Sequence, residues 1–369
     1  MPKPPNLDLN DADIGRPCYS RHHGPRDNGT QMKNRRVVIT RRGGPEVLKL
    51  VEDDLPDPKP GEVQVKILAT GVSFADLLMR HGLYRPVPPL PFAPGYDIVG
   101  IVQKNGDGAA QFEPGQMAAA LTITGGYAQY LNVPESELVS VPDGLDPAQA
   151  VCLVLNYVTA WQLLHRAASP ATGARVLVHA AAGGVGTAAL ELGRLAGFEM
   201  YGTASERKHP MVKAMGAVPI DYRSEDFVAR IRALTGDGVD LALDPIGGWN
   251  WWRSYKTLRG GGNLLVYGLS AAIGPQGANH LAAVGSFLLL GALKLIPDGK
   301  SASFYAITTM KKQHPEWFRE DLAALFELLA RKQITPVIAE RLPLAAATRA
   351  HEMLERGETT GKLVVLPQG

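Results

Sequence analysis

Short apolar runs alternate with helix-like segments in the second half of the chain. Val176, Leu177 and Val178 stand together without a polar interruption, which is typical of a strand covered on both faces. Strands are predicted at 175–179, 199–203, 218–220, 239–243 and 263–267, and helices at 184–196, 207–215, 224–234 and 249–258. This alternation predicts an α/β fold with a Rossmann-type, doubly wound parallel sheet.

The first half of the chain has a different pattern and indicates a mainly β module. Strands are predicted at 37–40, 62–69, 97–104 and 127–133, separated by proline and glycine turn signals. After residue 297 the pattern becomes mixed, with an amphipathic helix near 320–331 and a final strand at 362–366. We therefore expect an α/β domain (158–296) inserted between two pieces of a mainly β catalytic domain (32–157 and 297–369). Residues 1–31, rich in polar residues, proline and glycine, are expected to form a disordered extension.

Composition excludes several classes of protein. The net charge of +2 gives no global field that would favour nucleic acid. The most apolar stretch, 281–296, is broken by glycines and Lys294 and falls short of the roughly 18 to 20 apolar residues that span a bilayer. We expect it to form a buried or interface helix, with no stable membrane insertion. The two cysteines, Cys18 and Cys152, cannot make a disulfide framework or a structural zinc site, which favours a reducing cytoplasm.

The turn after the first strand of the α/β part carries the clearest chemical signal. Ala180, Gly183 and Gly186 form the pattern A-x-x-G-x-x-G, a variant of the dinucleotide-binding turn. Such glycines allow a sharp bend, and the following helix directs free N–H groups at a diphosphate. The residues predicted to bind the diphosphate are Ala182, Gly183, Gly184, Val185 and Gly186.

The end of the second predicted strand indicates which dinucleotide is bound. A carboxylate at this point binds the ribose 2′-OH, whereas hydroxyl and basic residues accept a 2′-phosphate. Here Ser205 stands at the strand end, and Arg207 and Lys208 follow it. We therefore predict a preference for NADPH over NADH. Glu206 could bring a carboxylate into the site, and Arg207 and Lys208 could instead be solvated charges at a helix start.

Several longer motifs resemble the zinc-independent quinone oxidoreductase branch of the medium-chain dehydrogenase/reductase family. The resemblance covers residues 32–369 and is close to vesicle-associated quinone-reductase-like proteins and polyketide-type enoyl reductases. It implies a GroES-like catalytic domain, a Rossmann domain that binds NADPH, and a homodimer. The matching segments are GVSFADL (71–77), RHGLY (80–84), PFAPGYD (91–97), GGYAQY (125–130), NYVTA (156–160), HAAAGGVG (179–186), GTAS (202–205), DPIGG (244–248) and GKLVV (361–365).

The resemblance also implies that the protein holds no metal. Zinc-dependent relatives use cysteine and histidine ligands at set points. In this chain Ser73 stands where they have a cysteine, and Tyr96 replaces a histidine. The four-cysteine structural lobe of those relatives is missing as well.

Further site residues follow from the resemblance. Tyr84 is the candidate polar group near the substrate and the candidate proton donor, with water as an equal alternative source of the proton. Ser73 is expected near the nicotinamide, and Asp76 is expected to position neighbouring side chains. The alternative for Tyr84 is a structural role in its loop, and the alternative for Asp76 is helix capping. Ser73 departs from an asparagine in the family, and the segment 299–305 lacks two further asparagines. The residues expected to contact the cofactor are Asn156, Thr159, Tyr222, Gly268, Phe304 and Lys362, with core packing as the alternative for Phe304 and an ordinary helix hydroxyl for Thr159.

The expected activity is hydride transfer from NADPH to a quinone or to the C=C bond of an α,β-unsaturated carbonyl compound, a small-molecule substrate. Two alternatives stay open at this point. One is a cofactor-binding protein with little catalysis that acts in vesicle or lipid traffic. The other is an enoyl reductase that serves a carrier-tethered pathway in trans, since the sequence carries no acyl-carrier segment.

Overall fold

A six-stranded parallel sheet forms the α/β part of the molecule. The computed structural model describes residues 32–84, 86, 88–274 and 277–369, so the predicted extension 1–31 lies outside the described residues. The strand order is β10-β9-β8-β11-β12-β15, and every neighbouring pair is parallel. The strands are β8 (Arg175–Val178), β9 (Glu199–Ala204), β10 (Val218–Asp221), β11 (Val239–Asp244), β12 (Leu258–Val266) and β15 (Ser301–Phe304).

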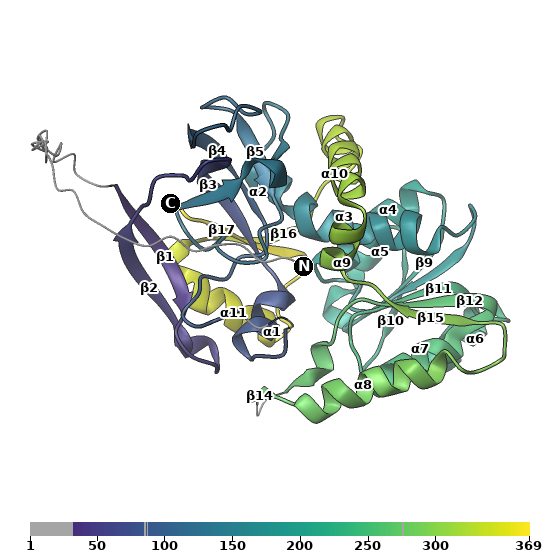
Figure 1. Cartoon of the computed structure of the whole chain (residues 1–369). Helices are drawn as coiled ribbons and strands as arrows, with labels where there is room; N and C mark the ends of the chain where they lie inside the picture. The colour runs from purple at the N-terminus through teal and green to yellow at the C-terminus, as the bar shows by residue number, and fades with distance from the viewer. Residues whose placement is uncertain (1–31, 85, 87, 275–276) are drawn as a thin grey trace, which may run out of the picture. The chain divides into compact units, whose positions relative to one another are not determined.

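Helices cover both faces of this sheet, as the predicted alternation requires (Figure 1). Helices α3, α4 and α5 lie on one face and α6, α7 and α8 on the other. Val176, Leu177 and Val178 are fully buried between these layers, which confirms the strand predicted there. The helices are α3 (Val158–Gln162), α4 (Gly184–Leu195), α5 (His209–Ala214), α6 (Phe227–Thr235), α7 (Trp249–Thr257) and α8 (His280–Leu293).

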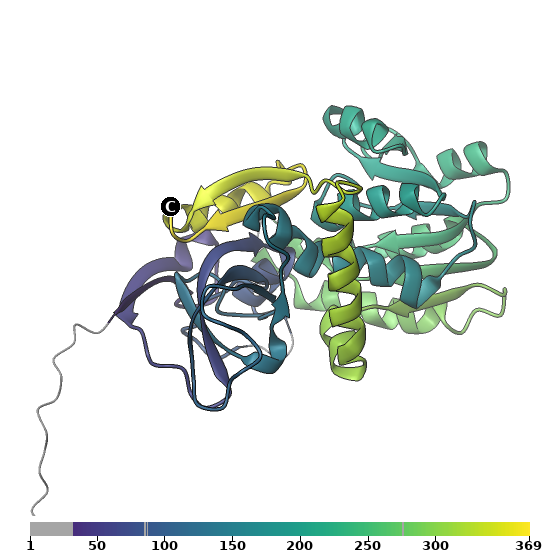
Figure 2. The same cartoon turned by 90° about the horizontal axis from the view of Figure 1, so that it is seen from above.

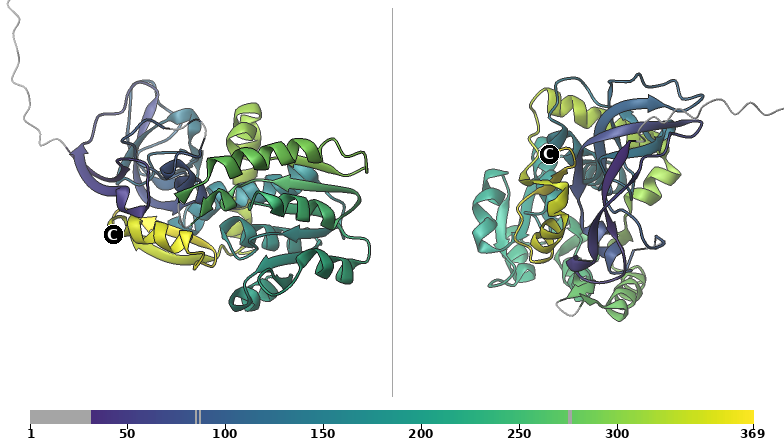
Figure 3. Two further views of the ribbon diagram at one scale, coloured as in Figure 1. Left: turned by 90° about the horizontal axis from the view of Figure 1, so that it is seen from below. Right: turned by 90° about the vertical axis from the view of Figure 1, so that its left-hand side faces the viewer.

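The mainly β part is built on a seven-stranded sheet in which most neighbouring strands are antiparallel. Its order is β16-β17-β3-β4-β5-β7, with β6 paired to β3. The chain end returns to this sheet, because β17 pairs with β3, and Figures 2 and 3 show the last strands beside it. The strands are β3 (Glu62–Val72), β4 (Ile98–Asn105), β5 (Met117–Ala120), β6 (Tyr130–Pro134), β7 (Val139–Ser140), β16 (Ile338–Pro343) and β17 (Lys362–Leu366); β1 (Lys33–Ile39) and β2 (Leu48–Asp54) form a hairpin.

The remaining helices pack against the mainly β part or lie between it and the α/β part. A helical segment at 147–168 contains two π-helical stretches, Leu153–Tyr157 and Leu163–Ala168, a feature that often marks functional sites. Helix α10 packs against α3 and corresponds to the amphipathic helix predicted near 320–331. The helices are α1 (Phe74–Arg80), α2 (Pro147–Cys152), α9 (Ile307–Gln313), α10 (Pro315–Ala330) and α11 (Ala347–Glu355).

Two sequence predictions need correction. The predicted boundary at residue 296 assigned 301–304 to the catalytic domain, but β15 pairs with β12 and extends the parallel sheet. Helix α8 is buried on one side only: Leu290 and Leu293 lie in the core, whereas Leu281 is 86% and Leu288 71% exposed, so the interface alternative remains. None of the helices in the described part of the chain is both long enough and apolar enough to cross a membrane.

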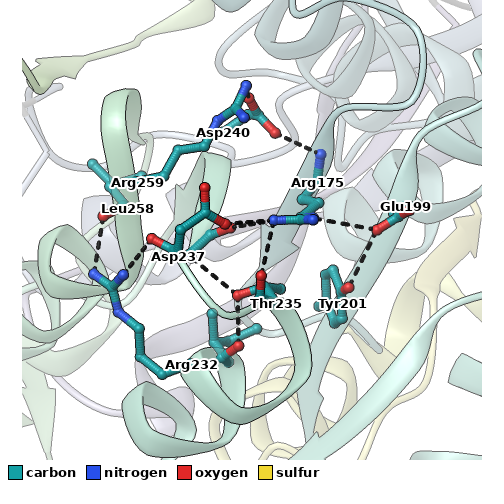
Figure 4. A network of polar contacts seen from close by, with 11 residues as sticks. Arg175, Glu199, Tyr201, Arg232, Thr235, Asp237, Asp240, Leu258 and Arg259 are labelled. Atoms are coloured by element: carbon teal, nitrogen blue, oxygen red, sulfur yellow. Dashed lines mark hydrogen bonds and ion pairs between the residues drawn. The ribbon is translucent and has the colours of Figure 1, made fainter.

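Charged side chains hold the amino-terminal ends of the parallel strands together (Figure 4). Arg175 donates to Asp237 over 2.6 Å and pairs with Glu199 over 3.5 Å. The Arg175 amide donates to Asp240, which also pairs with Arg259. These contacts lie at the end of the sheet opposite to the carboxyl ends of the strands, where open α/β sheets bind ligands.

Candidate functional site

A cavity of about 1270 Å³ lies at the carboxyl ends of β8, β9 and β11. Residues of the mainly β part, such as Phe74 and His81, complete its wall. Among the described lining residues Glu355 is the sole carboxylate, and it pairs with Arg80 and His81. The basic lining residues are Arg42, Lys208, Arg223, Arg253 and Arg356. This excess of positive charge suits an anionic ligand.

The predicted glycine turn borders this cavity, but its three glycines have different structural roles. Gly183 lines the cavity and caps α4 without a side-chain hydrogen bond, so the first amides of the helix lack acceptors from the preceding turn. A Cβ on Gly186 would lie 2.3 Å from the carbonyl oxygen of Ala180, so this glycine permits close packing of helix on strand. A Cβ on Gly184 would lie 1.9 Å from Asn156 Nδ2. Gly184 therefore leaves room for Asn156. Ala182 also lines the cavity, and Val185 lies in the first turn of α4.

The predicted ribose site gathers at the ends of β9 and β10. Ser205, Lys208, Tyr222 and Arg223 all line the cavity, whereas Glu206 is exposed and is not among its lining residues. Lys208 donates to the carbonyl of Thr359 over 2.6 Å and to that of Gly357 over 2.8 Å, which directs its ammonium. Burial lowers the pKa of Lys208, and the charges of Arg207 and Arg223 act in the same direction. The sequence analysis missed Arg223, although it directly follows Tyr222.

A buried polar chain under the cavity was not predicted from the sequence. Thr203 Oγ1 lies 3.0 Å from His179 Nδ1, and His179 Nε2 lies 3.0 Å from Ser254 Oγ. Ser254 donates to Asp244 Oδ2 over 2.6 Å, so its oxygen accepts from Nε2 and the Thr203 hydroxyl donates to Nδ1. Burial lowers the pKa of His179 and favours the neutral ring that this chain requires. The network fixes the ends of three strands under the ligand site.

Asn156 and Lys362 meet behind the glycine turn. Lys362 Nζ donates to Asp97 Oδ2 and to Asn156 Oδ1, each over 2.9 Å, and all three side chains are buried. Neither Asn156 nor Lys362 is among the residues lining the cavity. Their observed role is to join the start of β17 and of β4 to the helical segment beside Gly184.

The residues predicted near the nicotinamide lie around the ends of β12 and β15. Thr159 is buried in α3, and the phenol of Tyr305 donates to Gln162 of the same helix over 2.8 Å. A Cβ on Gly268 would lie 2.8 Å from the carbonyl oxygen of Pro245, so two loops approach closely here. Phe304 is 44% exposed, which contradicts the core-packing alternative.

Ser73 and Asp76 form a capping box at the start of α1. Asp76 Oδ2 accepts from the Ser73 hydroxyl over 2.7 Å and from the Ser73 amide over 2.8 Å, and Oδ1 accepts from the Gly95 amide over 3.0 Å. Burial raises the pKa of Asp76 to about 6, against the lowering effect of these hydrogen bonds. The structure therefore supports the capping alternative for Asp76, which also holds Ser73 in place.

Tyr84 bonds to a second tyrosine. Its hydroxyl lies 2.5 Å from that of Tyr96, and the rings meet edge to face at 6.0 Å. Tyr96 is buried and Tyr84 half-buried.

Ser73 and Tyr96 stand where zinc-dependent relatives have a cysteine and a histidine ligand. In this structure Ser73 caps helix α1, and Tyr96 bonds to Tyr84. Across the described residues, His, Cys, Asp and Glu side chains form no group of three or more able to hold a metal.

Comparison with known proteins agrees with this architecture. A family model described as an alcohol dehydrogenase GroES-like domain matches residues 59–143, and one described as a zinc-binding dehydrogenase matches 215–365. Human quinone oxidoreductase is 31% identical over 338 residues, which cover 90% of this chain and 97% of the relative. The rat synaptic vesicle membrane protein VAT-1 homolog is also 31% identical, over 90% of this chain and 83% of its own length.

Solved structures give the same result. Escherichia coli quinone oxidoreductase, complexed with NADPH, superposes with a TM-score of 0.81 at 30% identity and covers 90% of this chain and all of its own. The human VAT-1 homolog-like protein gives a TM-score of 0.79 at 27% identity, over 92% of this chain and 99% of its own. The fold and site define a medium-chain dehydrogenase/reductase, and the chain belongs to the quinone oxidoreductase-like branch of this oxidoreductase family.

Proposed function

We propose that this protein is an NADPH-dependent reductase that passes hydride to a quinone or to the C=C bond of an α,β-unsaturated carbonyl compound, and that it works in the cytoplasm. The observation that carries the proposal is the basic cavity at the glycine turn, where Glu206 is not among the lining residues. The NADPH complex of the Escherichia coli relative supports the choice of cofactor.

The residues present fit this cofactor. The open amides at the start of α4 would bind the diphosphate, and Ser205, Lys208, Tyr222 and Arg223 would bind the 2′-phosphate. Thr159, Gly268 and Phe304 would border the nicotinamide, which supplies the hydride when bound. The capping box keeps Ser73 fixed beside the start of α1, and the buried pair of Lys362 and Asp97 holds Asn156.

Fluorescence titration with NADPH and NADH, followed by turnover assays, tests the proposal. We expect tighter binding of NADPH, and NADPH oxidation with 9,10-phenanthrenequinone or a simple enone. Comparable kcat/KM with NADH and NADPH would overturn the cofactor preference. Turnover of acyl thioesters in preference to quinones would favour the enoyl reductase alternative. Cofactor binding without any turnover would favour the binding-protein alternative.

A homodimer is part of the proposal. The outer edge of β15 pairs with no further strand in the described part of the chain, and α8 packs beside β15. Leu281, Val284 and Leu288 of α8 are exposed, and Figure 3 shows the helix on the outside of the sheet. An open strand edge next to an exposed apolar helix suits a second copy of the same chain.

A further inference from the structure

Residues 356–361 connect α11 to β17 and form a strap beside the cofactor cavity. Near its start, Gly357 lines the cavity and is exposed to solvent. At its end, the Gly361 amide donates over 2.8 Å to the carbonyl oxygen of Ala182 in the glycine turn. A Cβ on Gly361 would lie 2.1 Å from the carbonyl oxygen of Val337, so this end is closely packed. The strap therefore belongs to the mainly β part of the chain but runs along the predicted nucleotide site.

Two basic side chains of the α/β part hold the first half of the strap. Lys208 Nζ donates to the carbonyl oxygen of Gly357 over 2.8 Å and to that of Thr359 over 2.6 Å. Arg207 Nη2 donates to the same Gly357 oxygen over 3.1 Å. Both basic residues lie in the short helical turn that follows β9. Lys208 lines the cavity, whereas Arg207 is exposed and is not among the lining residues. Arg207 therefore contacts the strap and not the proposed ligand site.

The ammonium group of Lys208 has enough donors to serve the strap and a phosphate together. A lysine ammonium carries three N–H donors. Two of them bond to strap carbonyls, which leaves one for an oxygen of a 2′-phosphate beside Ser205 and Tyr222. Because the carbonyl groups carry no net charge, the positive charge of Lys208 remains available to the phosphate. A bound phosphate would then fix Lys208 and, through it, the strap.

We propose that Arg207 and Lys208 are specificity-determining residues that close the strap beside the bound cofactor, and that Lys208 couples this closure to the 2′-phosphate of NADPH. The inference rests on the proposed function, which places the 2′-phosphate at the ends of β9 and β10. The cofactor leaves after the hydrogen bonds to the strap break. NADPH leaves slowly, because Lys208 bonds to the phosphate and to the strap at once. NADH lacks the phosphate, so only the hydrogen bonds to the strap restrain it.

Hydrogen–deuterium exchange of the protein without cofactor tests the closure. We expect Lys208→Met to raise the exchange rate of the strap amides about tenfold, because local opening becomes easier when two charged hydrogen bonds are lost. Lys208→Arg keeps charged donors and should retain most of the protection. Arg223→Met is the matched control, because Arg223 lines the same cavity but makes no hydrogen bond to the strap in the described part of the chain. Unchanged exchange in Lys208→Met would overturn the closure.

Stopped-flow measurement of cofactor dissociation tests the coupling. A lysine that only binds the 2′-phosphate has no effect on NADH, whereas strap closure predicts that Lys208→Met speeds NADH dissociation as well, by about tenfold. Arg207→Met should speed the dissociation of NADPH and of NADH by the same factor, about threefold, and should leave the preference between them unchanged.

The outcomes separate the closure from the proposed function. Unchanged NADH dissociation in Lys208→Met, or unchanged dissociation of both cofactors in Arg207→Met, would overturn the closure alone. Binding of neither cofactor by the unchanged protein would overturn the proposed function and the closure together. Cofactor binding without turnover would overturn the reductase activity alone. Melting temperatures identify a variant that fails to fold, and Arg207→Met changes an exposed residue, so it keeps the closure testable in that case.

Discussion

The ammonium of Lys362 lies 2.9 Å from a carboxylate oxygen of Asp97, and both side chains are buried. The other carboxylate oxygen accepts from the Gly71 amide over 2.7 Å. A Cβ on Gly71 would lie 2.0 Å from Lys362 Cε, so the backbone passes close to the lysine. This ion pair joins residues 265 positions apart in the chain.

Replacing one partner of this pair should destabilise the protein. Lys362→Met leaves the Asp97 carboxylate buried without its cation, and we expect the free energy of unfolding to fall by about 3–5 kcal/mol. Asp97→Asn in the same chain should restore part of the loss, because no buried charge is left unpaired. Urea denaturation of the single and double variants measures both effects. A change below about 1 kcal/mol in Lys362→Met would contradict the structural role, since pairs of that strength are typical of exposed sites.

Arg223 should contribute to the choice between NADPH and NADH. A charged hydrogen bond to the 2′-phosphate contributes about 1.5–3 kcal/mol, so Arg223→Ala should raise KM for NADPH by about 10- to 100-fold. KM for NADH, which lacks this phosphate, should stay nearly constant. Arg259→Ala is a control, because Arg259 pairs with Asp240 at the other end of the sheet. An equal rise in KM for NADPH and NADH would show that Arg223 does not bind the 2′-phosphate.

Gly184 and Gly285 offer a matched pair of helix glycines. A Cβ on Gly184 meets Asn156, whereas a Cβ on Gly285 meets nothing within 4 Å. We expect Gly285→Ala to raise the free energy of unfolding by about 0.5–1 kcal/mol through helix propensity. Gly184→Ala should lower it by about 1–3 kcal/mol, as overpacking does, and should weaken NADPH binding. Equal effects of the two substitutions on thermal unfolding would argue against the contact with Asn156.

Asp76 should make stability depend on pH. In the unfolded chain this carboxyl loses its proton near pH 3.8, whereas its pKa in the native state is about 6. Between these values the native state holds more protons than the unfolded state, so the free energy of unfolding falls as pH rises. A shift of about two pKa units corresponds to about 3 kcal/mol.

Asp76→Asn removes this titration. It also lowers the free energy of unfolding by an amount that does not depend on pH, because one carboxylate oxygen that accepts hydrogen bonds is replaced by an NH₂ group that faces a donor. The difference in unfolding free energy between the unchanged protein and Asp76→Asn should therefore decrease from pH 4 to pH 7. Urea denaturation at intermediate pH values measures it. A difference that stays constant over this range would show that the native pKa of Asp76 is not raised.

The exposed face of α8 should control assembly. Leu288→Glu introduces a charge into the proposed apolar contact, so we expect it to convert the dimer to a monomer in size-exclusion chromatography with light scattering. Glu320→Gln, on the distant helix α10, is the control and should leave the dimer intact. A monomeric unchanged protein would contradict the proposed homodimer.

The parallel sheet was largely predictable because its signal is local. The apolar run at 175–179 predicts a buried strand, and the glycine turn predicts the start of a helix. The structure has β8 and α4 at these positions. Helix α6, predicted over 224–234, begins at Phe227 after the capping residue Asp226. Strand β15 was missed because Ser301–Phe304 is short and lacks an apolar run, so that only its pairing with β12 reveals it.

The site was predictable only in part. Ser205, Lys208 and Tyr222 do line one cavity, because strand ends in a parallel sheet converge at one edge. Arg223 was not predicted because it belongs to no recognisable motif. The hydrogen-bonded network of Thr203, His179 and Ser254 was not predicted because its members come from separate elements. Sequence spacing carries no information about such contacts.

The sequence by itself determined the alternation of strand and helix, the glycine turn and the basic residues at the strand ends, because each depends on near neighbours in the chain. Only the tertiary structure decided that Asp97 neutralises Lys362, that Tyr96 bonds to Tyr84 and that α8 exposes Leu281 and Leu288 to solvent. These facts depend on which distant segments come together. That outcome is fixed by packing of the whole chain, and no local pattern of residues encodes it.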